Sequence, residues 1–385
     1  MRQRRSQPAF HTLLPNMNEE EYIYSIALTQ VPGIGSVWAK RLLSAADSAV
    51  SVFKDKEELS RLVPELPSRI KETLHAPDAL ARAEKEYDFM LKNHIRCLTI
   101  KEEAYPVRLR ECDDAPAVLF YKGAADLNAL HVINMVGTRN ATDYGIRICN
   151  RFFEELQTLC PDVLVVSGLA YGIDIHVHRA ALACRFPTVG ILAHGLDRIY
   201  PSEHSKTAVD MMEHGGLLTE FLTETTPERY NFVSRNRIVA GISDATIVVE
   251  SAEKGGSLIT AGIAGDYHRD CFAFPGKVTD EYSQGCNRLI RDNKAMLIQS
   301  AEDLVQTMGW NVPTRKTEHI QRNLFPDLSE DEKQIVSLLE KQGDMQINQL
   351  VVTSDIPVQK INAILFELEM KGVLSALAGG MYRLL

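Results

Sequence analysis

Short apolar runs, rich in β-branched side chains, recur along the middle of the chain. They lie at residues 132–136, 163–166, 188–192, 217–219, 246–249 and 271–274. None of them alternates with polar residues, which is typical of strands buried on both faces of a parallel sheet. Helical patterns separate the runs. The pattern therefore predicts an α/β domain over residues 100–307, with a Rossmann-like, doubly wound and mostly parallel sheet.

The segment before this domain has a helical pattern. Residues 1–17 are expected to be a flexible N-terminus, and residues 18–90 a small helical domain of the helix-hairpin-helix or SAM-like kind. The turn Val31-Pro32-Gly33-Ile34-Gly35 lies between two of its apolar-periodic stretches. A turn of this kind can offer backbone N–H groups to a DNA phosphate. A purely structural turn between packed helices is the favoured interpretation, because such turns are common.

The segment after the α/β domain predicts a linker and a third module. Residues 308–329 are polar, contain Pro313 and Pro326, and are expected to be a linker. Ser329 can cap a helix that begins with three acidic residues, and two more helical patterns and a Gly379-Gly380 hairpin turn follow. Residues 330–385 are therefore expected to form a winged-helix-like domain. Its surplus of acids favours a protein contact over DNA.

Composition narrows the class of protein. The 385 residues carry a formal net charge of -9, so any DNA site must be a local patch. No apolar run approaches the roughly 20 residues of a membrane span, and no apolar segment follows the basic start, so neither a membrane contact nor a signal peptide is expected. The seven cysteines are scattered without a CxxC pair, which favours a reducing compartment and argues against a zinc site.

Loops rich in small residues follow three of the predicted strands. Ligands of open parallel sheets bind at the carboxyl ends of the strands, where glycines let an anion approach the backbone and helix starts supply free N–H groups. Three such loops on one edge predict a cleft for phosphate groups. The candidate contacts are Gly137, Thr138, Arg139 and Tyr144 in the first loop, Ser167, Gly168, Tyr171 and Gly172 in the second, and Lys254, Gly256 and Ser257 in the third.

The type of phosphate ligand can be narrowed by elimination. The first loop lacks GxGxxG, the second predicted strand ends in Ser167 rather than an acid, and no Walker GK[ST] sequence is present. No nucleotide cofactor is therefore expected, and a polynucleotide backbone is favoured. The segment Arg235-Asn236-Arg237 at a helix start supports this interpretation. On a helix the two arginines lie on different faces, so only one is expected to reach a given phosphate.

Seven segments, in order, resemble the DNA-processing protein A (DprA/Smf) family. They are 136–139 with Tyr144-Gly145 (GSR…YG), 167–174 (SGxAxGID), 195–201 (GLDxxYP), 235–237 (RNR), 256–261, 274–276 and 285–290. This resemblance implies a cytoplasmic bacterial protein that binds single-stranded DNA. It further implies protection of that DNA, loading of the RecA recombinase onto it in natural transformation or recombination, and a homodimer formed through the Rossmann-like domain. The stretch 210–300 holds candidates for the dimer interface.

Carried over by position, the resemblance implies that ten residues contact phosphates. They are Gly137, Thr138, Arg139, Ser167, Gly168, Gly172, Arg235, Asn236, Gly256 and Ser257. The chain departs from the family at two positions where other members often have a lysine. It has Tyr171 in the second loop and Ser202 after the YP pair. Tyr171 could stack on a base, or pack on the edge of the sheet.

Two further classes of function remain as alternatives. Glu220 and Glu250 follow predicted strands and could be the acids of a related nucleotide-binding or nucleotide-cleaving enzyme, and a scaffold that recruits RecA without binding DNA is the other. No catalytic residue is assigned. Asp174 and His178 lie four residues apart on one helix face, where a hydrogen bond between them is favoured over a metal site.

Overall fold

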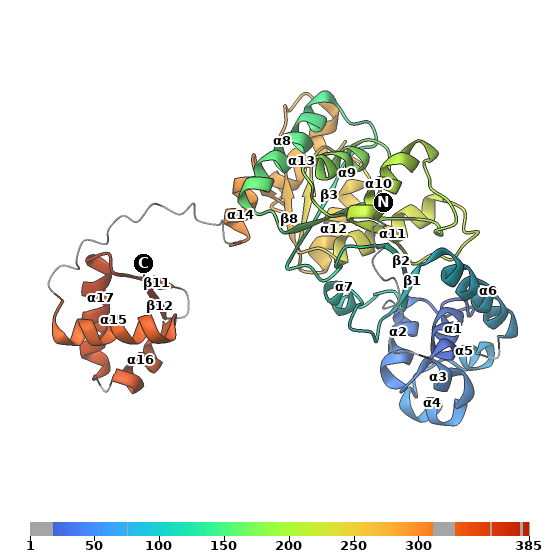
Figure 1. Ribbon diagram of the computed structural model, residues 1–385, viewed down its shortest axis with the longest axis horizontal. Helices are drawn as coiled ribbons and strands as arrows, with labels where there is room; N and C mark the ends of the chain where they lie inside the picture. The colour runs from blue at the N-terminus through green and yellow to red at the C-terminus, as the bar shows by residue number, and fades with distance from the viewer. Residues whose placement is uncertain (1–17, 75, 311–327, 355, 378–379, 385) are drawn as a thin grey trace, which may run out of the picture. The chain divides into compact units, whose positions relative to one another are not determined.

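The computed structural model describes residues 18–74, 76–310, 328–354, 356–377 and 380–384. The chain divides into two compact units, Met1–Pro313 and Thr314–Leu385 (Figure 1). The first unit contains a mostly parallel sheet with helices, and the second contains three helices and a small antiparallel sheet. These features confirm the predicted α/β class and the predicted C-terminal winged-helix-like fold.

A nine-stranded sheet forms the centre of the first unit. Its strands, in the order in which they lie side by side, are β1 (Arg96–Thr99), β2 (Val118–Gly123), β6 (Gly216–Thr219), β5 (Thr188–Ile191), β4 (Val163–Ser167), β3 (His131–Val136), β7 (Ala245–Val248), β8 (Asp270–Ala273) and β9 (Met296–Leu297). β1 pairs antiparallel with β2, and β2 pairs antiparallel with β6. All other pairs are parallel.

Helices cover both faces of this sheet. Alternate strand residues such as Ile133 and Val165 pack under α8 (Asp143–Leu159), α9 (Ile173–Ala183) and α14 (Ala301–Thr307). Their neighbours Val132 and Val166 belong to a second core with α7 (Val107–Glu111), α11 (Arg229–Gly241) and α12 (Ser257–Asp266). The remaining helices are α10 (Ser205–His214) and α13 (Gln284–Arg291), with short 3-10 turns at Ser202–His204 and Glu281–Ser283. Burial on both faces explains why the strands lack polar alternation.

Within the described residues 18–74 and 76–93, six helices precede the sheet. They are α1 (Glu19–Leu28), α2 (Ser36–Ala45), α3 (Ala49–Lys54), α4 (Lys56–Leu62), α5 (Ser68–Thr73) and α6 (Pro77–Asn93). In Figure 1, α1 to α5 form a cluster beside β1 and β2. Specific contacts attach the helices: the hydroxyl of Tyr22 on α1 donates to Glu102 over 2.7 Å, and the guanidinium of Arg82 on α6 donates to the Thr223 carbonyl over 2.7 Å. The helices therefore share one compact unit with the sheet.

The second unit has its own hydrophobic core. It consists of α15 (Glu330–Gln342), α16 (Ile347–Ser354) and α17 (Val358–Met370), with the strands β10 (Met345–Gln346), β11 (Leu374–Leu377) and β12 (Met381–Leu384). Ser329 caps α15 in a reciprocal capping box with Glu332, as the sequence predicts. Ile335, Leu350 and Leu365 lie at the centre of the core, each at most 1% exposed.

Candidate nucleic-acid interface

The three loops selected from the sequence lie at one edge of the sheet. They follow the carboxyl ends of β3, β4 and β7, which are adjacent in the strand order β4-β3-β7. The chain runs from β3 to β4 on one side and returns to β7 on the other, so the topological switch point lies between β3 and β7. Open α/β sheets bind ligands at this place. We call the loops 137–142, 168–172 and 249–256 together the loop rim.

Each loop of the rim ends at the start of a helix. Thr142, Gly172 and Gly256 are the N-cap residues of α8, α9 and α12. A helix start carries a partial positive charge that favours an anionic ligand where no protein carboxylate already occupies it. The start of α8 is already capped by the Glu250 carboxylate, which leaves the starts of α9 and α12 for such a ligand. The predicted gathering of the glycine-rich loops on one sheet edge is therefore present in the structure.

Backbone contacts lock the three loops together. The Thr138 N–H donates to the Glu250 carbonyl over 2.8 Å, and the Ile173 N–H donates to the Thr138 carbonyl over 3.0 Å. Gly172 has a φ of 75°, and a Cβ there would lie 2.2 Å from the Thr138 carbonyl oxygen. A Cβ on Gly137 would lie 2.4 Å from Ile173. These two positions require glycine because the loops touch, so the rim has a fixed shape.

The carboxylate of Glu250 is used to build this edge. It is 2% exposed and accepts hydrogen bonds from the Thr142 N–H and hydroxyl at the start of α8. A Cβ on Gly145 would collide with the same carboxylate, which explains the glycine. An acid held in this way caps a helix.

Cationic and aromatic side chains are exposed at the rim. Arg139 lies in the first loop with its guanidinium 5.1 Å from the ring centre of Phe232, a cation–π contact. Phe232 is 6.0 Å from the ring of Tyr200, and Tyr171 and Tyr200 are 43% and 45% exposed. The sequence interpretation missed Phe232 and Tyr200, although both lie within or beside the motif segments at 195–201 and 235–237.

The other predicted rim residues differ in their accessibility. Lys254, Gly256 and Tyr144 are exposed, and the Tyr144 hydroxyl donates to the Pro275 carbonyl over 2.5 Å. The ring centre of Tyr171 lies 5.2 Å from that of His204, its hydroxyl donates to Glu203 over 3.1 Å, and the side chain is 43% exposed, so stacking on a base stays a prediction. Gly137, Thr138, Gly172 and Asn236 are partly buried. These residues remain candidate contacts.

Four residues predicted to contact DNA are buried beneath the rim. They are Ser167, Gly168, Ser257 and Arg235. The Ser167 hydroxyl is fully buried and donates to the Met135 carbonyl over 2.7 Å, and the Ser257 hydroxyl is buried and donates to Ser251. Gly168 is buried against the Arg235 guanidinium. Side-chain phosphate contacts by Ser167 and Ser257 are therefore disfavoured, because both hydroxyls already form hydrogen bonds inside the fold.

The burial of Arg235 disfavours the predicted phosphate contact of this residue, which stays a prediction. Arg235 is 4% exposed, and its guanidinium donates to the carbonyls of Gly168 and Ile191 at the ends of β4 and β5. Burial lowers the pKa of Arg235 to about 10, and the nearby Asp174 opposes this shift. Burial raises the pKa of Asp174, and the Arg235 charge opposes that rise. The arginine supports the second loop from below and balances a buried carboxylate.

The predicted hydrogen bond between Asp174 and His178 is absent among these described residues. His178 Nδ1 lies 2.7 Å from the Thr188 hydroxyl, while its Nε2 has no hydrogen-bond partner. Burial lowers the pKa of His178 to about 3, so the imidazole is neutral at pH 7. The i,i+4 spacing was correct, but β5 brings Thr188 closer to the imidazole than Asp174. Within the described ranges, no cluster of three His, Cys, Asp or Glu side chains could hold a metal ion.

The second arginine of the RNR segment points elsewhere, as its helical position predicts. Arg237 forms an ion pair with Glu220 and donates to the Ser36 hydroxyl over 3.1 Å. Burial raises the pKa of Glu220, with the Arg237 charge opposing the rise. Glu220 Oε2 is held by Arg237, while its Oε1 is buried without a hydrogen-bond partner among the described residues.

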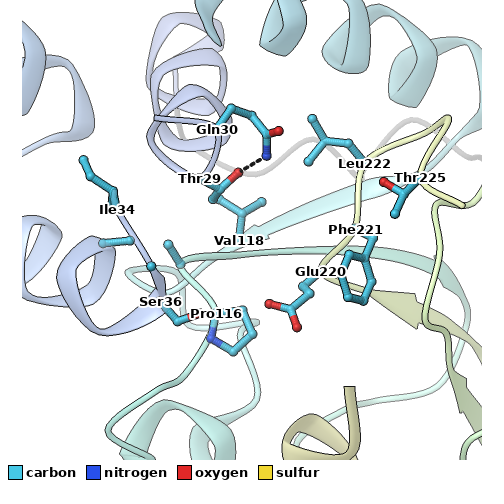
Figure 2. Close-up of a pocket in the computed structure, with 13 residues that line it drawn as sticks. Thr29, Gln30, Ile34, Ser36, Pro116, Val118, Glu220, Phe221, Leu222 and Thr225 are labelled. Atoms are coloured by element: carbon cyan, nitrogen blue, oxygen red, sulfur yellow. Dashed lines mark hydrogen bonds between the residues drawn. The ribbon is translucent and has the colours of Figure 1, made fainter. Parts of the chain in front are cut away.

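The N-terminal hairpin turn faces the same ion pair. Gly35 and Ser36, at the start of α2, line a pocket of about 250 Å³ together with Pro116, Glu220 and Phe221 (Figure 2). A carboxylate beside the helix start disfavours a DNA phosphate in this place. The geometry agrees with the favoured structural interpretation of the turn, which joins the helical cluster to the sheet.

Two general features complete the description. All seven cysteines are free, and six of them are buried. None of the helices in the described part of the chain is both long and apolar enough to cross a bilayer.

Family models match both units of the chain. The model described as DNA recombination-mediator protein A matches residues 96–309, and the DprA winged helix domain matches residues 324–380. Protein Smf of Escherichia coli is 34% identical over 287 residues, which cover 73% of this chain and 75% of that protein. The DNA processing protein DprA of Bacillus subtilis is 40% identical over 215 residues, which cover 56% of this chain and 71% of that protein.

Solved structures give the same result. The X-ray structure of DNA processing protein A from Streptococcus pneumoniae matches with a TM-score of 0.63 and 29% identity, over 74% of this chain and 97% of that chain. DNA processing protein A from Helicobacter pylori, whose structure concerns its mode of binding single-stranded DNA, matches with a TM-score of 0.50 and 26% identity. This match covers 56% of this chain and 95% of that chain.

Proposed function

Because the chain belongs to the DNA recombination-mediator protein A (DprA/Smf) family, we propose that it binds single-stranded DNA along the loop rim. One observation carries this proposal: at the edge where three helices start, the exposed cation Arg139 lies against the loop that holds the exposed Tyr171 and over the ring of Phe232, which neighbours the exposed Tyr200. A single strand offers phosphates and unstacked bases together, and this alternation of donors and rings suits both.

The local charge of the rim supports the proposal despite the net charge of -9. Arg139 and Lys254 are exposed there, whereas Glu250 and Asp174 are buried and have internal partners. Buried, compensated acids contribute little repulsion at the surface, while exposed cations act on a phosphate directly. One exposed acid, Glu253, also lies in the third loop, 4.0 Å from Arg288, so the two exposed cations of the rim outnumber its exposed acids by one.

The finer role follows the family. We propose that the protein protects single-stranded DNA and loads the RecA recombinase onto it in recombination or transformation. It works as a homodimer through the sheet domain, without catalysis. The commitment of Glu220 to Arg237 and of Glu250 to Thr142 supports the absence of hydrolytic chemistry. Mixing the protein with RecA and DNA coated by single-strand-binding protein tests the loading role, since faster RecA filament assembly is expected.

Fluorescence anisotropy with labelled oligo-dT, at two salt concentrations, tests the DNA site. Binding is expected to weaken with salt because phosphate contacts release counterions. Arg139→Ala is expected to cost about 1–3 kcal/mol of binding free energy, the value of a charged hydrogen bond. Arg185→Ala is the matched control. Arg185 is also exposed, but it precedes β5 at the opposite edge of the sheet.

The two variants separate a rim site from diffuse charge attraction. Equal losses in Arg139→Ala and Arg185→Ala would mean that the net loss of a cation, rather than the rim, governs affinity. An unchanged affinity in Arg139→Ala would remove the first loop from the site.

A further inference from the structure

Helix α17 of the second unit is apolar on two opposite faces. Its inner face places Ile361, Ile364, Leu365 and Leu368 in the core, each at most 7% exposed. As the third helix of a winged-helix fold, α17 is the element that such folds commonly use for recognition. A surface helix usually has a polar face opposite its buried face. The outer face of α17 departs from this pattern.

Three apolar side chains follow one another along that outer face. Ala363, Phe366 and Met370 have the helical spacing of three and four residues and are all exposed, Phe366 by 64% and Met370 by 75%. We call them the α17 stripe. At 100° per residue the stripe lies opposite the buried face. Large apolar groups aligned on an exposed helix mark an interaction surface, because isolated exposed residues would not line up.

Acidic groups border the stripe on both sides. Glu367 and Glu369 are exposed, and their helical positions place them on opposite flanks of Phe366 and Met370. The cations nearest in sequence have acidic partners: Lys360 binds Asp331 over 2.5 Å, and Lys371 binds Glu332 over 2.6 Å. Outward from α17, the uncompensated charge is therefore negative.

The wing of this domain shows the same balance. Arg383 on β12 is held by Asp344 through two of its guanidinium nitrogens. Its charge is therefore already matched within the protein. A DNA phosphate would lie near the glutamates of the helix, and Arg383 is not available to it because this side chain is already paired with Asp344. Binding of duplex DNA by α17 as a recognition helix is therefore disfavoured.

We propose that the α17 stripe docks an amphipathic helix of another protein, with apolar residues at spacings of three and four flanked by lysine or arginine. The apolar side chains of such a helix cover Phe366 and Met370, and its cations face Glu367 and Glu369. This is helix recognition through an apolar stripe, with orientation set by charge complementarity. The stripe belongs to the second unit and shares no residue with the loop rim.

The probe for this surface is a labelled synthetic helix of leucine, alanine and lysine with a leucine stripe, titrated into the full chain by fluorescence anisotropy. Two peptides serve as controls, one with the same composition in scrambled order and one with glutamate in place of lysine. Phe366→Glu is expected to weaken binding of the first peptide roughly tenfold or more, the effect of losing a central apolar anchor. Leu130→Glu is the matched variant. Leu130 is 77% exposed and lies in the first unit.

The outcomes are distinct. Loss of binding in Phe366→Glu but not in Leu130→Glu, with weak binding of both control peptides, supports the proposal. Equal binding of the scrambled peptide, or no effect of Phe366→Glu, overturns it. A Phe366-dependent affinity for duplex DNA also overturns it, in favour of a nucleic-acid surface. A concentration-dependent dimer that Phe366→Glu abolishes in sedimentation overturns it in favour of a second copy of the chain. Far-UV circular dichroism confirms that each variant is folded.

Discussion

Replacing Arg235 by methionine separates a structural arginine from one that binds phosphate. Methionine has a similar length and fills much of the same space, so the change removes mainly the charge and the hydrogen bonds. Two carbonyls lose their donor, those of Gly168 and Ile191. The buried carboxylate of Asp174 also loses the positive charge that opposes the rise of its pKa.

The expected cost follows from this geometry. Breaking a buried pair of charges by removing one partner costs about 3–5 kcal/mol, and the lost carbonyl contacts are part of that figure. A folded domain has only about 5–15 kcal/mol of stability, so the loss is large. Each further unit by which the pKa of Asp174 rises in the folded variant lowers the free energy of unfolding by about 1.4 kcal/mol at neutral pH.

The pH dependence has a definite sign. Burial holds the pKa of Asp174 above its unfolded value of about 3.9, so its protonated form favours folding. That contribution is present at low pH and is lost as the pH rises through the folded pKa. Without Arg235 the folded pKa is higher still. The cost of Arg235→Met is therefore expected to be smaller at pH 5 than at pH 7.5, and Asp174→Asn is expected to recover part of it.

Urea unfolding, followed by tryptophan fluorescence and circular dichroism at both pH values, measures this cost for the wild type, both single variants and the double variant. A loss of stability below about 1 kcal/mol in Arg235→Met, together with a loss of oligo-dT affinity, would refute the reasoning. That result would return Arg235 to the role of a phosphate contact. A cost that is the same at both pH values would refute the coupling to Asp174.

Three more outcomes are expected. Gly172→Ala should cost about 1–3 kcal/mol in urea unfolding because its φ of 75° is strained for any side chain; a neutral effect would contradict the interlocking of the loops. Glu250→Leu should cost about 1–3 kcal/mol in urea unfolding by leaving the donors of Thr142 unpaired, and an unchanged stability would contradict its capping role. Lys254→Ala should make the slope of log K against log salt for oligo-dT shallower by about 0.7, and an unchanged slope would remove Lys254 from the site.

The buried strands and the loops after them could be predicted from the sequence because both depend on local pattern. Continuous apolar runs identify strands that are covered on both faces. Glycines directly after these runs identify loops that pack closely against the backbone of a neighbouring loop. β1 and β2 were not assigned as strands. β1 is a short antiparallel strand at the edge of the sheet and includes the half-buried Arg96, so its pattern is weak.

The direction of individual side chains could not be predicted in the same way. The sequence placed Arg235 and Arg237 on different faces, but it gave no sign that one lies under the rim and the other at the helical cluster. The partner of His178 was missed for a similar reason. Thr188 comes from another strand, and a contact between distant segments leaves no mark in local spacing.

The contact between Gly172 and the Thr138 carbonyl has a consequence for variation among relatives. Neither loop can gain a side chain or change its path unless the other moves with it, so these two segments must change together or remain as they are. Evolution can then adjust the surface only through outward-facing positions such as Arg139 and Tyr171. Efforts to alter the preferred oligonucleotide should randomise those outward positions and keep the paired backbone untouched.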